Sequence, residues 1–268
     1  MGAKIGAMQN EAEEYMFFFF IDHKKRKTEI HEGRNGRRQQ KTQVSVGCPL
    51  EDAHRRPSAR RGRVRQEVDT FISAGHETTA IAVKWTLYLT GLYPEVQEKI
   101  HQELDSVLGA DSKGPLSVAD LNELKFLDCV IKESNRLYPP VPAIARKISE
   151  DITICGYTIP NRAHIIVSSF LVHRDEDVFP DPEKFDPERF LPENSTHIPE
   201  CAYIPFLTGP RDCIGRVFAE MEVKVLVCHI LRGFSLHSLD SRDQVLPLAK
   251  LSLQSSQPTR IKFRRRQQ

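Results

Sequence analysis

Ten residues, from Phe206 to Gly215, constrain the fold of this chain more than any other part of its sequence. They read Phe-Leu-Thr-Gly-Pro-Arg-Asp-Cys-Ile-Gly, so Gly209 and Pro210 bend the backbone shortly before Cys213. Apolar residues recur at helical spacing directly afterwards. We therefore expect Cys213 at the start of a helix, where free backbone N–H groups and the helix dipole favour a thiolate over a thiol.

The other residues of this segment suit a flat ligand that carries acidic groups. Gly209 and Gly215 would let the backbone approach such a ligand closely. Phe206 would shield the sulfur from water, and Arg211 supplies a cation for a carboxylate. The alternative interpretation of Cys213 alone is a structural cysteine that packs without any ligand.

Four segments have apolar residues at helical spacing between recognisable start and stop signals. We expect helices from Val68 to a stop at Gly91, from Pro94 to Gly109, from a capping-box start at Ser117 to a stop at Pro139, and from about Ile214 to Leu231. Short alternating runs predict strands at Ile152–Ile154, Tyr157–Ile159 and His164–Ser168. A proline-rich segment without strand signals follows, between Pro180 and Pro205. The pattern indicates a mainly α fold with a small β element.

Positive charge is concentrated near the start of the chain. Residues 21–65 contain 14 Lys or Arg and 5 Asp or Glu, whereas the whole chain has a formal net charge of +2. Because residues 1–65 show no sustained apolar period, we expect a basic segment without a core, separate from a domain at 66–268. This segment is a solvated, disordered tail, a sequence that does not belong to the domain at all, or a basic arm for anionic lipid or nucleic acid. The charge therefore does not indicate a nucleic-acid-binding domain.

Cysteine spacing and hydropathy indicate in which cellular compartment the protein resides and whether it spans a membrane. None of the six cysteines forms a Cys-x-x-Cys pair, so neither a zinc site nor a disulfide framework is indicated, which favours a reducing compartment. The apolar run Met16–Ile21 is far shorter than the roughly 18 residues that a membrane-spanning helix needs. No signal peptide is recognised.

The pattern Phe-x-x-Gly-x-Arg-x-Cys-x-Gly over Phe206–Gly215 resembles the haem-binding signature of cytochromes P450. The resemblance implies that Cys213 is the axial thiolate ligand of the iron of haem b. It also implies that Arg146 and Arg211 bind haem propionates. The alternative for either arginine is an ordinary surface position.

Two further motifs occur in the order that the family has. The segment Glu133-Ser134-Asn135-Arg136 resembles the family's Glu-x-x-Arg helix motif, and Pro187–Phe190 resembles its Pro-Glu-Arg-Phe segment. The resemblance implies that Glu133, Arg136 and Arg189 form a buried charge network that holds the cysteine loop. Taken without the resemblance, Glu133 and Arg136 would be an ordinary i, i+3 pair of charges, which is common on helix surfaces. Asn135 stands where the family usually has an apolar residue.

A third motif, Ala74–Thr79, is similar to the family's oxygen-activation segment. The resemblance implies that Thr78 hydrogen-bonds the bound dioxygen and that Glu77 helps to relay protons. Taken alone, the segment would be a buried helix with a glycine packing contact. Many members of the branch that this chain most resembles have a Glu at the place of Ala74, which can bond covalently to haem. We therefore expect a non-covalent haem.

The resemblance to the family covers about residues 65–263. The finer sequence resembles the fatty-acid ω-hydroxylase branch, family 4, in the runs Glu95–Leu108, Ile154–Pro160, Ser168–Asp175 and Phe179–Pro192. The resemblance implies the C-terminal, haem-proximal half of the cytochrome P450 fold. It implies a monooxygenase that inserts one oxygen atom of O₂ into a C–H bond of a lipophilic substrate such as a fatty acid. Electrons would come from NADPH through NADPH–cytochrome reductase, with cytochrome b5 as a further partner.

By the same resemblance, the full-length family lies on the cytosolic face of the endoplasmic reticulum membrane, and we expect its membrane anchor to be absent from this chain. No nucleic-acid partner is expected. Two alternatives stay open: a truncated, catalytically inactive relic of such an enzyme, and a binding module whose residues 21–65 contact nucleic acid or acidic membrane.

Overall fold

The computed structural model describes residues 61–109 and 114–266. The interpretation of residues 1–60 as part of a basic segment, and the apolar run Met16–Ile21, lie outside the described residues. The contacts divide the described chain at Gly75, so residues 61–74 and the residues from Gly75 onward are each considered by themselves.

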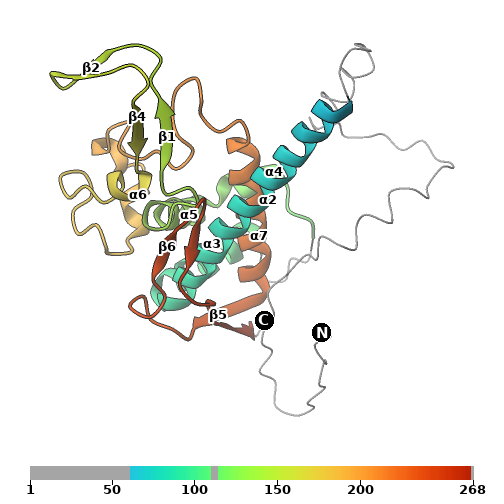
Figure 1. The fold of residues 1–268 in the computed structure, drawn as a ribbon. Helices are drawn as coiled ribbons and strands as arrows, with labels where there is room; N and C mark the ends of the chain where they lie inside the picture. Colours follow the sequence, from blue (N-terminus) through green and yellow to red (C-terminus); the bar gives the residue numbers. More distant parts are fainter. Residues whose placement is uncertain (1–60, 110–113, 267–268) are drawn as a thin grey trace. The chain divides into compact units, whose positions relative to one another are not determined.

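Helices dominate the described residues (Figure 1). Their bounds are α2 Arg61–Leu92, α3 Pro94–Leu108, α4 Val118–Glu123, α5 Lys125–Leu137, the one-turn α6 Ser169–Val172 and α7 Arg216–Gly233. Two 3-10 helices, η3 Pro187–Phe190 and η4 Ser195–His197, lie in the proline-rich segment. No helix among the described residues is long and apolar enough to cross a membrane.

Four antiparallel strand pairs complete the described fold. They are β1 Ile144–Lys147 with β4 His164–Val167, β2 Ile152–Ile154 with β3 Tyr157–Ile159, β5 Phe234–Ser238 with β8 Ile261–Arg265, and β6 Pro247–Ala249 with β7 Leu253–Ser255. The prediction of a mainly α fold with a small β element is confirmed. The strands β1 and β5–β8 were not predicted from the sequence.

Three predicted helix boundaries differ from the structure. Helix α2 begins at Arg61, so residues 61–65, expected in the basic segment, are helical; an ion pair between Arg65 and Asp69 spans one turn there. The helix predicted from Ser117 is interrupted at Leu124, where the backbone leaves the helical region. Helix α7 begins at Arg216 rather than Ile214, because Gly215 precedes its first turn as N-cap.

The core of the unit that starts at Gly75 lies between α3, α5, α7 and the adjoining part of α2. Trp85 is fully buried, stacks on Tyr138 with ring centroids 4.1 Å apart, and donates its indole N–H to the carbonyl of Leu253. Apolar faces of the four helices surround it, with Leu89, Ile100, Leu104, Leu127, Val130, Val227 and Leu231 all at most 1% exposed. This core fixes α5 and α7, the two helices that carry the site.

Candidate functional site

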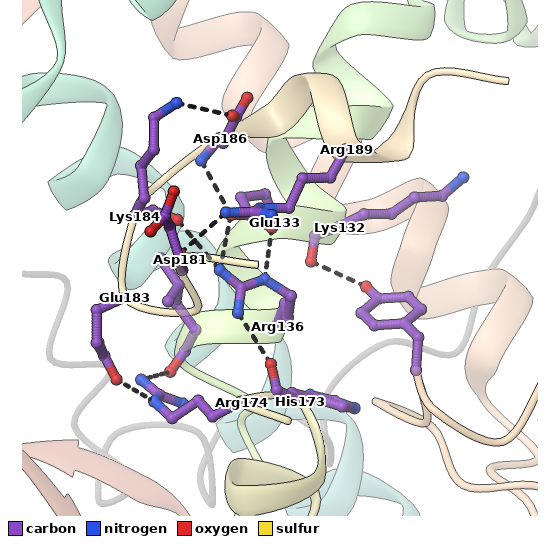
Figure 2. A network of polar contacts seen from close by, with 12 residues as sticks. Lys132, Glu133, Arg136, His173, Arg174, Asp181, Glu183, Lys184, Asp186 and Arg189 are labelled. Atoms are coloured by element: carbon purple, nitrogen blue, oxygen red, sulfur yellow. Dashed lines mark hydrogen bonds and ion pairs between the residues drawn. The ribbon is translucent and has the colours of Figure 1, made fainter. Parts of the chain in front are cut away.

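A cluster of buried charges is centred on α5. Glu133 and Arg136, both 0% exposed at their side chains, form a two-pronged pair: Arg136 Nε lies 2.7 Å from Glu133 Oε2, and Nη2 lies 2.8 Å from Oε1. Arg189, from η3, places its Nε 3.6 Å from Glu133 Oε1. Figure 2 shows the Arg136 guanidinium between Glu133 and the carbonyl of His173. The structure thus brings Glu133, Arg136 and Arg189 together.

Backbone groups from the proline-rich segment complete this cluster. Arg136 donates to the carbonyls of His173 and Lys184, and Glu133 accepts the N–H of Asp186 at 2.9 Å (Figure 2). Burial raises the pKa of Glu133, while the hydrogen bond from Arg136 acts in the opposite direction. Sequence reasoning missed these backbone partners, since no local pattern marks them. Their effect is to tie the segment around residues 173–189 to helix α5.

The cysteine segment forms a closed loop. Cys213 N–H donates to the carbonyl of Phe206 at 2.9 Å, and Cys213 carbonyl accepts the N–H of Arg216 at the start of α7. Two residues inside the loop have left-handed backbones, Leu207 with φ 64° and Gly209 with φ 86°. Glycine adopts this conformation without the cost that Leu207 incurs. The loop therefore presents an exposed Cys213 just before α7.

Apolar side chains are uncovered beside this cysteine. Ile214 is 88% exposed, Val217 72% and Phe218 63%, and Met221 on the next turn of α7 is also exposed. Large apolar side chains grouped on one helix end normally pack against something. The first turns of α7 therefore offer a surface on which an apolar partner would bury area.

The two arginines that are predicted to bind haem propionates lie at the surface. Arg211 is exposed within the loop, and Arg146 is exposed on β1, where its Nη1 donates to the carbonyl of Ala145. Within the described residues no ion pair involves either side chain. Open space surrounds Gly209 where a side chain would begin, whereas a Cβ at Gly215 would lie 3.8 Å from Cys213 Sγ.

The segment Ala74–Thr79, which the resemblance predicts to act in oxygen activation, lies on α2. Glu77 accepts a 2.5 Å hydrogen bond from the Ser252 hydroxyl and a 3.2 Å hydrogen bond from the Gln254 amide. Thr78 is half-buried. The hydrogen bonds of Glu77 thus run to Ser252 and Gln254 rather than to the cysteine loop. Sequence reasoning missed Ser252 and Gln254, which lie more than 170 residues away in the chain.

Comparison with known proteins identifies the class of this site. The family model described as Cytochrome P450 matches residues 2–263. The chain therefore belongs to the cytochrome P450 family, as the sequence resemblance predicts.

Individual relatives narrow this to family 4. The chain is 47% identical over 203 residues to cytochrome P450 4V2 of Rattus norvegicus and 46% identical over 203 residues to that of Homo sapiens. It is 42% identical over 200 residues to cytochrome P450 4c3 of Drosophila melanogaster. These matches cover 75–76% of this chain and 37–38% of each relative. The chain thus spans well under half the length of the relatives that it matches.

Proposed function

We propose that this chain carries the haem-binding portion of a haem-thiolate monooxygenase, with Cys213 as the axial thiolate ligand of haem b. The single observation that carries the proposal is an exposed cysteine in a loop closed by the Phe206–Cys213 backbone hydrogen bond, next to uncovered apolar side chains of α7. When bound, a thiolate-ligated haem supplies the activation of O₂ by which one oxygen atom enters a C–H bond.

The residues present fit such a group. Haem is a flat apolar macrocycle with two carboxylates, and the loop combines a sulfur donor with the exposed apolar side chains Ile214, Val217 and Phe218. Arg211 and Arg146, neither in an ion pair within the described ranges, would hold the carboxylates by charge-assisted hydrogen bonds. The open space at Gly209 lets backbone approach the macrocycle.

Each of the other predicted site residues has a role in this proposal. Phe206 excludes water from the sulfur, and Gly215 leaves room beside Cys213 Sγ. The buried charge cluster of Glu133, Arg136 and Arg189 supports the cysteine loop by fixing the segment around residues 173–189 to α5. On α2, Thr78 offers a hydroxyl to the reacting oxygen, and Glu77 holds and passes a proton at its carboxylate.

The family supports a finer proposal for the whole protein. We infer a domain at residues 66–268 that corresponds to the haem-proximal half of the fold, preceded by a basic segment at 1–65 whose residues 61–65 form the start of α2. Its substrate would be lipophilic, such as a fatty acid, and its electrons would come from NADPH through NADPH–cytochrome reductase, with cytochrome b5 as a further partner. The site of action would be the cytosolic face of the endoplasmic reticulum membrane.

A product assay tests this function. Haem-loaded protein supplied with reductase, NADPH and lauric acid is expected to give hydroxylated laurate, and Thr78→Ala is expected to divert electrons away from product. Full haem loading without hydroxylated product in the unaltered protein would contradict the monooxygenase function.

Because Ala74 offers no carboxylate for an ester, acid extraction is expected to release all haem from the peptide.

A further inference from the structure

His173 is fully buried and lies between the charge cluster and the segment that leads into the cysteine loop. It directly follows α6, and its carbonyl accepts Arg136 Nη1 at 2.9 Å (Figure 2). Its ring Nε2 lies 2.8 Å from the backbone nitrogen of Ile204 and accepts that N–H. A single residue thus connects the cluster on α5 to the segment that enters the loop.

This geometry fixes the protonation state of the ring. Because the N–H of Ile204 donates to Nε2, this nitrogen carries no proton, and the neutral ring holds its proton on Nδ1, which is buried and has no hydrogen-bond partner within the described residues. Burial lowers the pKa of His173 to about 4. The nearby cations Arg136 and Arg174 lower it as well, whereas the backbone carbonyl groups of Asn135 and Arg136 raise it. The ring of Tyr203 covers one side at a centroid distance of 5.2 Å.

Backbone hydrogen bonds continue from Ile204 to the cysteine. The carbonyl of Ile204 accepts the N–H of Leu207 at 3.1 Å, which fixes the turn with the left-handed Leu207. The neighbouring carbonyl of Phe206 accepts the N–H of Cys213 at 2.9 Å. A displacement of Ile204 would therefore move both ends of the loop.

Tyr203 packs this segment against Phe190, with ring centroids 4.7 Å apart. A pocket of about 290 Å³ lies against the segment, lined by Tyr203, Phe206 and Leu207 on one side and by residues of α5 and α7 on the other. The hydroxyl of Tyr203, which donates to the carbonyl of Lys132 at 3.0 Å, is the second polar anchor.

We propose that His173 is a positioning residue for Cys213, acting as a neutral hydrogen-bond acceptor that anchors Ile204 and thereby sets the position of the haem-binding loop. This inference rests on the proposed function for the part that concerns haem. The anchoring itself exists with or without haem.

The decisive variants are His173→Leu, which removes the acceptor, and His173→Gln, whose Oε1 restores an acceptor near the place of Nε2. Amide hydrogen exchange of the haem-free chain at pH 7 reads out the N–H groups of Ile204 and Cys213. We expect His173→Leu to accelerate exchange at both on the order of tenfold or more, and His173→Gln to recover most of the protection. His101→Leu is the matched control, because His101 is also buried but lies on α3.

In the haem-supplemented protein, His173→Leu is expected to weaken the red-shifted band of the reduced carbon monoxide complex, and His173→Gln to retain it. Unchanged exchange at Ile204 and Cys213 in His173→Leu would overturn the proposal. If the unaltered chain shows no such band, the proposed function fails while the exchange data still decide the anchoring.

A direct measurement on the unaltered chain covers the case in which His173→Leu does not fold. Nitrogen NMR of ¹⁵N-labelled protein is expected to show a protonated Nδ1, an unprotonated Nε2, and a coupling across the hydrogen bond between Ile204 N and His173 Nε2. A ring protonated at Nε2, or absence of that coupling in a folded chain, would contradict the proposal.

Discussion

At the scale of single residues, the charge cluster shows how much depends on complete pairing. Glu133 and Arg136 are both fully buried, and each uses its oxygens or nitrogens on several partners. Such a pair contributes little net stability compared with apolar residues, but loss of one member leaves an uncompensated charge inside the protein. The cluster therefore specifies one arrangement of α5 and the segment that follows it.

Arg136→Ala is expected to lower the free energy of unfolding by about 3–5 kcal/mol, because Glu133 would be left buried without its main partner. Urea unfolding followed by circular dichroism measures this. Arg65→Ala is the control, since the Arg65–Asp69 pair is exposed and is expected to contribute less than about 1 kcal/mol. Equal effects of the two substitutions would contradict a structural role for the cluster.

His173 predicts an acid-dependent loss of stability. Its pKa is about 4 in the folded chain and 6.5 ordinarily, so the unfolded chain takes up a proton first. Protonation of this ring therefore does not affect the free energy of unfolding above pH 6.5. As the pH falls from 6.5 to about 4, it lowers the free energy of unfolding by about 3 kcal/mol. Unfolding free energies at pH 7 and pH 4.5 measure it. His173→Gln is expected to lose less stability over this interval, and an identical pH dependence would refute the assignment.

At the scale of elements, helix α5 shows which boundaries local sequence signals predict. The capping box of Ser117 and Asp120 is observed at α4, as its spacing predicts. The break at Leu124 has no local signal, because the cap of α5 comes from another helix: Glu103 on α3 accepts the N–H groups of Phe126 and Leu127 at 2.6 and 2.9 Å. Sequence reasoning therefore merged two helices into one.

Glu103→Gln is expected to destabilise the chain by about 1 kcal/mol, because a neutral amide supplies one acceptor oxygen where the carboxylate supplies two at a helix N-terminus. Amide exchange at Phe126 and Leu127 is expected to accelerate as well. Glu98→Gln, an exposed substitution on the same helix, serves as the control. Unchanged protection at both amides would show that Glu103 does not cap α5.

The strand pairs illustrate the same limit. Short runs at 152–159 and 164–168 predict β2, β3 and β4 correctly, because the alternating pattern and the turn residues lie within or directly beside the strands. The pairing of β5 with β8 joins Phe234 to Arg265 across the C-terminal segment, and no pattern within either strand specifies that partner. The hydrogen bond from Ser252 to Glu77 is unpredictable for the same reason.

At the scale of the whole molecule, short motifs with fixed spacing carried the identification. Residues 206–215, 133–136 and 187–190 are separated in sequence, and the structure brings the last two into one cluster next to the segment that enters the first. Family membership agrees with the resemblance, while the matched relatives are more than twice as long as the matched region. The side chains of Val217, Phe218 and Met221 on α7 are exposed, and under the proposed function haem would bury this surface.

The carbon monoxide difference spectrum of the reduced, haem-supplemented protein tests the central claim most directly. A strongly red-shifted Soret band is expected, because thiolate ligation of the iron produces it, and Cys213→Ala is expected to abolish the band while Cys201→Ala, at another exposed cysteine, retains it. A spectrum typical of free or histidine-ligated haem in the unaltered protein would contradict the assignment of Cys213.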